Sequence, residues 1–452
     1  MALEYYTPGV YVEEVSSGFK PITGVPTSII GFIGSAKKGK VNKPVQVTTW
    51  ASYFDEFIGY NTQDKLNPRG GVEKDALGNP IKENVPNSKT TDLDWAMYAF
   101  FNNGGAKAYV VSVGGNSSAV ENKIDVSKKD DKKDDKKKEQ PTMGAKSFDL
   151  TNAIIGNDGG PDKRTGMHCF KEVDEISVLV APGIVASAVQ QEILSYCETF
   201  NIFAILDAPQ KLEQLRDYGL STDLNGLSGL SAKCASKQAA IYFPWVKTYN
   251  PDTKSTISVA PSGFVAGIYS RSDKERGVHK APANEIVRLA TELEYNLSDA
   301  EQETLNQNGV NCIRNFSDSG IRVWGARTTI CVADPEWKYV NVRRLFNMVE
   351  KSLQVGSKWA VFEPNDVFLW KKLKRNVTAF LTRVYNSGAL AGGSADEAFF
   401  VRCDASTNPN ENIDSGIVTI EVGIAPVKPA EFIVFRISQK APGAEETEST
   451  EE

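Results

Sequence analysis

Apolar and polar residues alternate near both ends of the chain. Every second residue from Val418 to Ile424 is apolar, which is the period of a half-buried β-strand. The run 432–438 predicts a second strand, apolar on both faces, and the prolines between the two runs exclude a tight two-residue hairpin. Residues 9–15 predict a further strand at the other end of the chain. Because a lone strand is not stable in water, these terminal strands need partners.

Strand and helix patterns alternate through the middle of the chain. Strands are predicted for residues 27–34, 108–113, 175–183, 201–209 and 239–246. Helices are predicted for residues 50–58, 92–103, 185–200, 262–275 and 284–297. Alternation of this kind implies an α/β fold with a largely parallel sheet flanked by helices.

After Asp334 the pattern changes to two amphipathic helices followed by two strands. Asp334 and Pro335 form a helix cap with proline at the first helical position. The helix after them carries an apolar stripe of Val342, Leu345, Phe346, Val349 and Leu353. A second helix is predicted at 366–386. Its inward-facing residues would be Trp370, Leu373, Val377, Phe380, Leu381 and Val384. The strands are residues 398–404 and 416–424, joined by a polar loop.

Two segments lack the apolar residues of a core. Residues 61–90 are polar and rich in Gly, Pro and Asn, which predicts a long surface loop. Residues 128–139, KKDDKKDDKKKE, are of low complexity and predict a mobile external loop, because they cannot bury enough apolar area to offset ordering. Their lysines are nearly matched by acids and no aromatic residues interleave, which argues against nucleic-acid binding.

Composition places the chain among globular proteins. It has 452 residues, of which 41% are hydrophobic and 24% charged, enough for two to four domains. The chain has no run of 18 apolar residues, so no membrane span is predicted. Its first residues lack the pattern of a secretory signal. Six scattered cysteines without a CxxC pair predict buried free thiols. The net charge of −6 is uneven, because residues 341–385 hold nine Lys and Arg against three Asp and Glu.

Motifs for catalysis are weak. Residues 34–40, GSAKKGK, follow a strand like a phosphate-binding loop, but the required Ser/Thr and the following helix are missing. His168 neighbours Cys169, yet adjacency in sequence does not create a base and nucleophile pair. With two histidines and no cysteine pairs, no metal site is predicted, and we expect no catalytic or cofactor-binding residues. An α/β enzyme, such as a hydrolase whose site these motifs do not reveal, remains the alternative function.

Several stretches together resemble the sheath proteins of contractile bacteriophage tails, tailocins and extracellular contractile injection systems. They are YTPGVYVEEV (6–15), PSGFVAGIYSRSDKERGVHKAPANE (261–285), GIRVWGARTTICVADPEWKYVNVRRLF (320–346), WAVFEPND (359–366), SGALAGG (387–393), and the two strands and final run of 398–439. The match reaches both ends of the chain and most of its C-terminal half. Residues 61–90 and 116–167 show no such resemblance and look like insertions.

The resemblance implies a structural protein without catalysis. Subunits of this family stack as six-membered rings around an inner tube, forming a helical assembly that contracts and drives the tube through a target membrane. The implied partners are further copies of the chain, alone or with paralogous sheath proteins, the inner tube protein, and baseplate and terminal cap proteins. Neither cofactor, nucleic acid nor membrane insertion is implied. The protein would be made in the bacterial cytoplasm and function in a phage tail or phage-tail-like particle.

The resemblance also implies an α/β multidomain fold with a non-catalytic, subtilisin-like middle domain and an α+β C-terminal sheath domain. The expected divisions are an N-terminal arm (1–25), an N-terminal sheath region (26–115), a charged insertion (116–147), the subtilisin-like domain (148–333), the C-terminal domain (334–424), a C-terminal arm (425–440) and an acidic tail (441–452).

In this family the terminal strands are exchanged between subunits, which supplies the partners that they need. The arm residues would be Val10, Tyr11, Val12, Val15, Phe432, Ile433, Val434, Phe435 and Ile437. The hairpin that accepts them would contain Phe399, Phe400, Val401, Val418, Ile420 and Val422. A sheet closed within one chain is the alternative, since sequential strands often pair.

A basic cluster at the start of the second C-terminal helix is the candidate contact with the tube. It contains Lys371, Lys372, Lys374 and Arg375, which crowd the positive end of the helix dipole and so favour an acidic partner. The alternative is a solvated basic face without a partner. A second basic pair, Arg343 and Arg344, is a candidate for contacts with neighbouring subunits.

Overall fold

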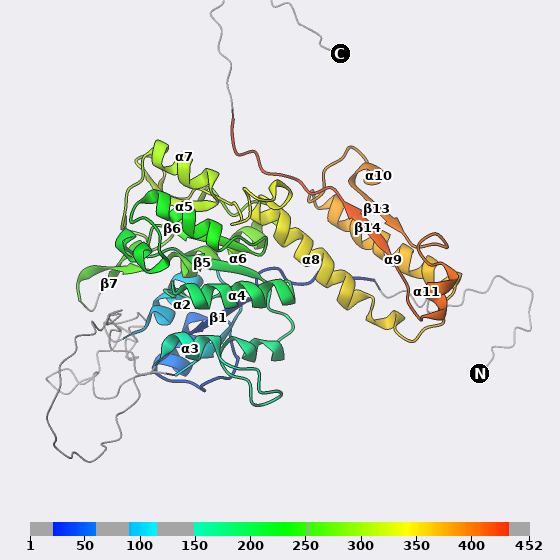
Figure 1. The fold of residues 1–452 in the computed structure, drawn as a ribbon, viewed down its shortest axis with the longest axis horizontal. Coiled ribbons are helices and arrows are strands. Elements are labelled where there is room, and N and C mark those ends of the chain that lie inside the picture. Colours follow the sequence, from blue (N-terminus) through cyan, green and yellow to red (C-terminus); the bar gives the residue numbers. More distant parts are fainter. Residues whose placement is uncertain (1–20, 60–89, 115–148, 251–252, 434–452) are drawn as a thin grey trace, which may run out of the picture.

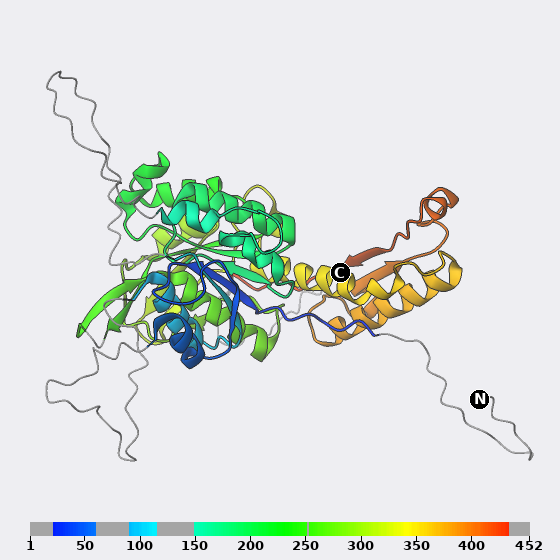
Figure 2. The ribbon, with the colours of Figure 1, turned by 90° about the horizontal axis from the view of Figure 1, so that it is seen from below.

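The structure is a computed structural model, and it describes residues 21–59, 90–114, 149–250 and 253–433 (Figure 1). It comprises an α/β body, residues 26–333, and a C-terminal region, residues 334–424, into which one long helix leads (Figures 1 and 2). Outside the described residues lie the loops predicted at 61–90 (apart from residue 90) and 128–139, residues 1–20 of the N-terminal arm and residues 434–440 of the C-terminal arm.

One nine-stranded sheet forms the centre of the body. Its order is β2 (Val45–Val47), β3 (Ala108–Ser112), β1 (Ile30–Gly34), β4 (Val178–Val180), β5 (Phe203–Asp207), β6 (Ala239–Phe243), β11 (Val310–Phe316), β12 (Gly320–Val323) and β9 (Glu285–Ile286). The strands from β3 to β11 in this order are parallel, and the strands outside them are antiparallel. A smaller antiparallel sheet contains β10 (Glu292–Leu293), β7 (Val246–Asn250) and β8 (Ser255–Val259).

Helices cover both faces of the large sheet. Phe203 and Ile205 of β5 point into the core beneath α2 (Asp92–Asn102) and α6 (Pro261–Arg276), whereas Ala204 and Leu206 point into the opposite core. That second core is closed by α3 (Leu150–Ile155), α4 (Ser187–Phe200), α5 (Leu224–Lys233) and α7 (Asp299–Gln307). The strands are buried on both sides, as parallel sheets between helices are.

Close approach of α2 and α6 depends on small residues. A Cβ atom at Gly263 would lie 2.6 Å from the Cα of Ala96, so the two helices can touch only without a side chain there. The body also contains α1 (Trp50–Tyr53), the π-helical turn η1 (Phe54–Ile58) and the 3₁₀ turns η2 (Gly166–Glu172) and η3 (Leu212–Tyr218).

The C-terminal region packs two long helices against a two-stranded sheet. Its elements are η4 (Pro335–Trp337), α8 (Val340–Gly356), η5 (Lys358–Ala360), α9 (Val367–Asn386), α10 (Ala395–Ala398), β13 (Phe399–Arg402), α11 (Asn410–Asp414) and β14 (Glu421–Ile424). Leu345 and Val349 of α8 meet Val377 and Phe380 of α9 in its core, and Ile22 from the N-terminal segment joins them. The inward residues predicted for the second helix are all buried.

Most predicted elements of the body are confirmed, and the mixed α/β fold with them. One division between domains is wrong, because regions 26–115 and 148–333 share the large sheet. Ile30 in β1 pairs with Ala108 on one side and with Val178 on the other. Residues 116–147 are therefore inserted between two strands of one sheet and do not link two domains.

The prediction of a helix at 284–297 is also wrong, because this segment forms the short strands β9 and β10. Ile286 pairs with Arg322, and Leu293 pairs with Val246. Asn284 and Leu289 have φ angles of 58° and 70°, which no right-handed helix accommodates. Hydrogen bonding at two sheet edges has outweighed a weak helical period.

Three predicted boundaries of helices and strands differ from those in the structure. Asp334 caps only the 3₁₀ turn η4, and α8 begins later, at Val340. The run 239–246 is divided between β6 and β7, which belong to different sheets. The strand predicted at 416–424 is shorter, because only Glu421–Ile424 pairs.

Candidate interaction surfaces

The thiol beside His168 lies in an environment that disfavours its ionised form. Burial raises the pKa of Cys169 to about 11, with Glu172 adding to the shift, so the thiol stays protonated near neutral pH. Its sulfur contacts the carbonyl oxygens of Asn42 and Arg164. Within the described residues, no group of His, Cys, Asp and Glu is placed to hold a metal ion, and no helix is long and apolar enough to cross a membrane.

The two-stranded sheet of the C-terminal region has two outer edges without a strand partner among the described residues. β13 and β14 pair antiparallel, with Phe399 opposite Ile424 and Val401 opposite Val422. Phe399 and Val401 pack on the core, whereas Phe400 is 55% exposed and its ring covers Gly423 on the other strand. Backbone donors and acceptors on such edges can bind further strands.

Val418 and Ile420, which were predicted to lie in the hairpin, precede the paired strand. They pack instead against the cluster of Leu369, Trp370 and Leu373 at the start of α9. The paired part of the predicted hairpin is therefore Phe399–Arg402 with Glu421–Ile424.

Residues 425–431, here called the strap, lead from β14 back to the α/β body. The amide of Ala391 donates to the Ala425 carbonyl at 2.8 Å, and the amide of Val427 donates to the Ala389 carbonyl at 3.2 Å. The side chain of Asn341 on α8 donates to the Val427 carbonyl at 3.3 Å. The strap is thus part of the folded subunit, although it was predicted to belong to the free C-terminal arm.

The strap ends at a carboxylate held by the body. Arg327 donates from Nε and Nη2 to the two oxygens of Glu431 at 2.7 and 2.6 Å, and Asn306 Nδ2 donates at 2.9 Å. Tyr339 donates its hydroxyl at 3.1 Å, and the Lys338 ammonium lies at 3.3 Å. Burial raises the pKa of Glu431, but these hydrogen bonds and charges outweigh it and lower the pKa to about 2. Glu431 is therefore ionised and fixed.

Immediately after this clamp the chain turns outward. Phe432 and Ile433 are 73% and 77% exposed and border a cavity of about 840 Å³ beside Trp324 and Glu431. The other predicted arm residues, Val10, Tyr11, Val12, Val15, Val434, Phe435 and Ile437, lie outside the described residues.

The basic cluster lies on the exposed side of α9. Lys371, Lys374 and Arg375 are exposed, and Lys372 is half-buried with its ammonium 4.5 Å above the ring of Trp359. Lys372 is thus partly engaged within the chain, which leaves it less available to a partner than Lys371 and Lys374. Asp366 caps the helix by accepting from the Leu369 amide at 2.8 Å.

Arg343 and Arg344 are wrong as candidates for contacts with neighbours, because both are buried and paired within the chain. Arg344 donates to both oxygens of Asp273, at 3.0 and 2.6 Å, and lies 4.5 Å above the ring of Tyr269. Arg343 pairs with Glu350 at 2.7 Å. The α8 arginines therefore fasten α8 to the body and to itself.

Two features of these surfaces were missed by sequence reasoning. The Glu431 clamp joins residues 104 positions apart, and no local pattern announces such a pair. The turn between α8 and α9 exposes several large apolar side chains, and only the run VFEPNDVF hinted at it, since its apolar residues do not follow the stripe of either helix.

Comparison with known proteins gives one consistent family. The model of the phage tail sheath protein central domain matches residues 156–329, and that of the phage tail sheath C-terminal domain matches residues 332–440. The tail sheath protein of Burkholderia phage BcepMu is 24% identical over 469 residues, covering 95% of this chain and 96% of that protein. The tail sheath protein of Escherichia phage P2 is 20% identical over 447 residues, covering 95% of each.

Solved structures agree with these matches. The helical sheath of the anti-feeding prophage in its contracted state is 26% identical, with a TM-score of 0.66 over 96% of this chain and 100% of that chain. The sheath complex of the PVC extracellular contractile injection system, also contracted, is 26% identical, with a TM-score of 0.65 over 97% of this chain and 99% of that chain.

Proposed function

The chain belongs to the phage tail sheath family and is a structural subunit of a contractile sheath, and we propose that it polymerises by exchanging terminal strands around the β13–β14 hairpin. Stacked six-membered rings of the subunit would enclose an inner tube. Contraction of the assembly would drive that tube through a target membrane.

The observation that carries this proposal is the hairpin with two open edges. An isolated two-stranded sheet is marginally stable in water, and here both outer edges lack a strand among the described residues. An N-terminal strand from one neighbour and a C-terminal strand from another would complete a four-stranded sheet. Each added strand supplies roughly four to six backbone hydrogen bonds at about 0.5–1.5 kcal/mol each.

We infer from the strap which part of the C-terminal arm is able to move. Residues 425–431 are bonded to the C-terminal region and to the body. Only the chain beyond Glu431 is then available to follow a neighbour. The exchanged strands would stay paired while whole subunits rotate during contraction.

The inner tube is the proposed partner of the basic cluster on α9. Charge complementarity steers docking and gives an affinity that salt weakens, which suits a partner that must be held and then released. Changing Lys371 and Lys374 to Glu should therefore weaken sedimentation with purified tubes at low salt more than at high salt. Unchanged binding at both salt concentrations would contradict this assignment and favour a solvated basic face.

We further infer that the middle of the body is a non-catalytic relative of the subtilisin fold. A mostly parallel sheet between two layers of helices supports this inference. A hydrolase with an unrecognised site is the competing function. The proposed partners also include the inner tube, baseplate and cap proteins. Neither a nucleic acid nor a cofactor is proposed.

Negative-stain microscopy of the purified chain tests the function as a whole. We expect long tubes of stacked rings. A discrete monomer or small oligomer that hydrolyses a panel of ester and peptide substrates would contradict the proposal and support the enzyme.

A further inference from the structure

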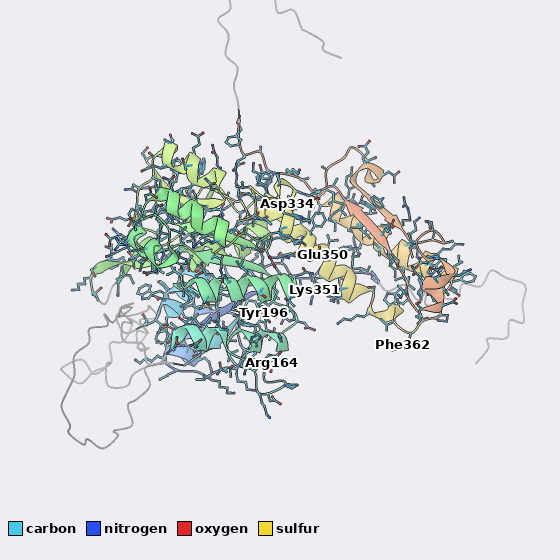
Figure 3. All side chains as sticks on the ribbon, in the orientation of Figure 1. Arg164, Tyr196, Asp334, Glu350, Lys351 and Phe362 are labelled. Carbon is cyan, nitrogen blue, oxygen red and sulfur yellow. The ribbon has the colours of Figure 1, made fainter. Side chains whose placement is uncertain are left out.

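The turn between α8 and α9 carries a cluster of exposed apolar side chains. Phe362 is 103% exposed and Phe368 80% exposed, and more than half of the surface of Val361 and Val367 is open. We call these four residues the aromatic tip. Figure 3 shows Phe362 at the far end of the C-terminal region, well away from Tyr196 and Arg164 on the body. Clusters of this kind on a protein surface mark interaction sites.

The backbone at the tip is strained where the aromatic side chain is most exposed. Phe362 has a φ of 68°, a left-handed conformation that is unfavourable for a bulky residue and easy for glycine. Among the described residues, no ring contact or hydrogen bond of the Phe362 side chain offsets this cost. Strain at an exposed residue is retained where it serves a function, such as presenting a side chain in one position.

The structure around the turn holds the tip rigidly. Asn365 accepts from Trp370 Nε1 at 2.8 Å and donates from Nδ2 to the carbonyl of Ile417 at 3.1 Å. Asp366 caps α9, and the amide of Glu363 donates to the Ala360 carbonyl at 3.2 Å. The tip is therefore fixed before any partner binds, which reduces the ordering cost of binding.

The tip and the basic cluster share one face of α9. Val367, Phe368, Lys371, Lys374 and Arg375 are separated by three or four positions, the spacing that places side chains side by side on a helix, and all five are exposed. One continuous surface thus presents aromatic and aliphatic groups at the end of the molecule and positive charge directly beside them.

We propose that the aromatic tip seats in an apolar recess on the acidic surface of the inner tube protein. The inference rests on the proposed function and deepens it by adding an apolar anchor to the basic contact. An acidic partner follows from the adjoining positive charge. The tip is continuous with the basic cluster on α9, for which the inner tube is the proposed partner, so one partner would cover both.

Phe362→Gly is the sharpest test, because it removes the aromatic ring and relieves the backbone strain together. We expect the thermal unfolding midpoint to stay the same or rise, whereas affinity for purified inner tubes falls at least about tenfold, as for a central aromatic anchor. The loss should be equal at low and high salt. Phe368→Ser, at a position with ordinary helical geometry, should weaken tube binding in the same direction.

Val332→Ser is the matched control, since Val332 is 64% exposed and lies outside the C-terminal region, and its tube binding should equal that of wild type. Unchanged tube binding by Phe362→Gly would overturn the inference. So would a variant that binds tubes normally but fails to form sheath without a tube, which would make the tip a subunit contact. If wild-type sheath itself does not bind tubes, the proposed function fails instead.

Discussion

The α/β body and the C-terminal region bury their apolar residues in different ways. In the body, alternate residues of one strand enter two separate cores, so that both faces of the sheet are covered by helices of the same chain. In the C-terminal region the sheet has two strands, one face on α9, and an exposed Phe400 on the other. The large sheet is completed within one chain, whereas an isolated two-stranded sheet is marginally stable in water, which is why we propose that neighbouring subunits complete it.

The carboxyl groups of the body and of the strap differ in their pKa values. Asp207 and Asp94 in the body are almost fully buried, and burial raises the pKa of each carboxyl to about 6 despite several hydrogen bonds to it. Glu431 meets basic groups at the end of the strap, and its pKa falls to about 2. The body therefore contains carboxyls that take up a proton at a higher pH than usual, whereas the strap is held by one that stays ionised to a lower pH than usual.

Deleting residues 1–15 should give the largest effect of any change. Assembly into tubes should be lost, because one edge of the hairpin loses its proposed strand, while circular dichroism of the monomer stays nearly unchanged. Electron microscopy and circular dichroism of the truncated chain measure both. Tubes that still form and contract would break the proposed dependence of the C-terminal region on neighbours.

The same substitution in the two regions should have opposite consequences. Phe100 is fully buried against Phe32, with ring centroids 5.2 Å apart, so Phe100→Ala should destabilise the monomer by about 3–5 kcal/mol. Phe400→Ala should cost the monomer less than about 1.5 kcal/mol, since the side chain is mostly exposed, but should weaken tube assembly. Urea unfolding and sedimentation distinguish the two; equal loss of monomer stability would contradict the comparison.

Glu431→Gln tests the clamp at the end of the strap. Removing the carboxylate leaves Arg327, which is nearly buried, without its ionic partner. We expect a loss of about 1–3 kcal/mol, reduced from that of a fully buried pair because Glu431 is partly exposed. Hydrogen exchange should quicken in 425–433 and stay unchanged in the body strands. Unchanged exchange in the strap would show that other contacts hold it.

Acid should change the stability contributed by the body carboxyl Asp207 and by the strap carboxyl Glu431 with opposite sign. A carboxyl with a raised folded-state pKa stabilises the native state below its ordinary pKa of about 4, and this contribution is lost as pH rises through 6. The stability of wild type relative to Asp207→Asn should therefore grow as pH falls from 7 to 5. Relative to Glu431→Gln, it should shrink only as pH falls from about 4.5 towards 2. Thermal unfolding of the three proteins at each pH provides the measurement; parallel profiles would contradict both assignments.

The smallest effect is expected from residues 128–139. Replacing them with a short Gly/Ser linker should leave monomer stability and tube formation intact, since their composition supplies no apolar area for a core. Calorimetry and microscopy of the variant check this. Blocked assembly would show that the insertion is an interface.

The local hydrophobic pattern predicts an element well where the buried residues repeat regularly along that element's own sequence. The inward stripe of α9 could be predicted from Trp370 to Val384, because a helix with one buried face repeats every three to four residues. The segment around Ile286 could not, because its partners are strands far away in the sequence. For the same reason the sequence did not predict the clamp between Arg327 and Glu431. It also did not predict the buried partners of Arg344, which was wrongly expected to lie on the surface.

Cryo-electron microscopy of the assembled tubes tests the central proposal most directly, by tracing which chains flank β13 and β14. We expect a four-stranded sheet in which the N-terminal strand comes from one neighbouring subunit and the C-terminal strand from another. A sheet that stays two-stranded in the tube, or whose added strands both belong to the same chain as the hairpin, would contradict it.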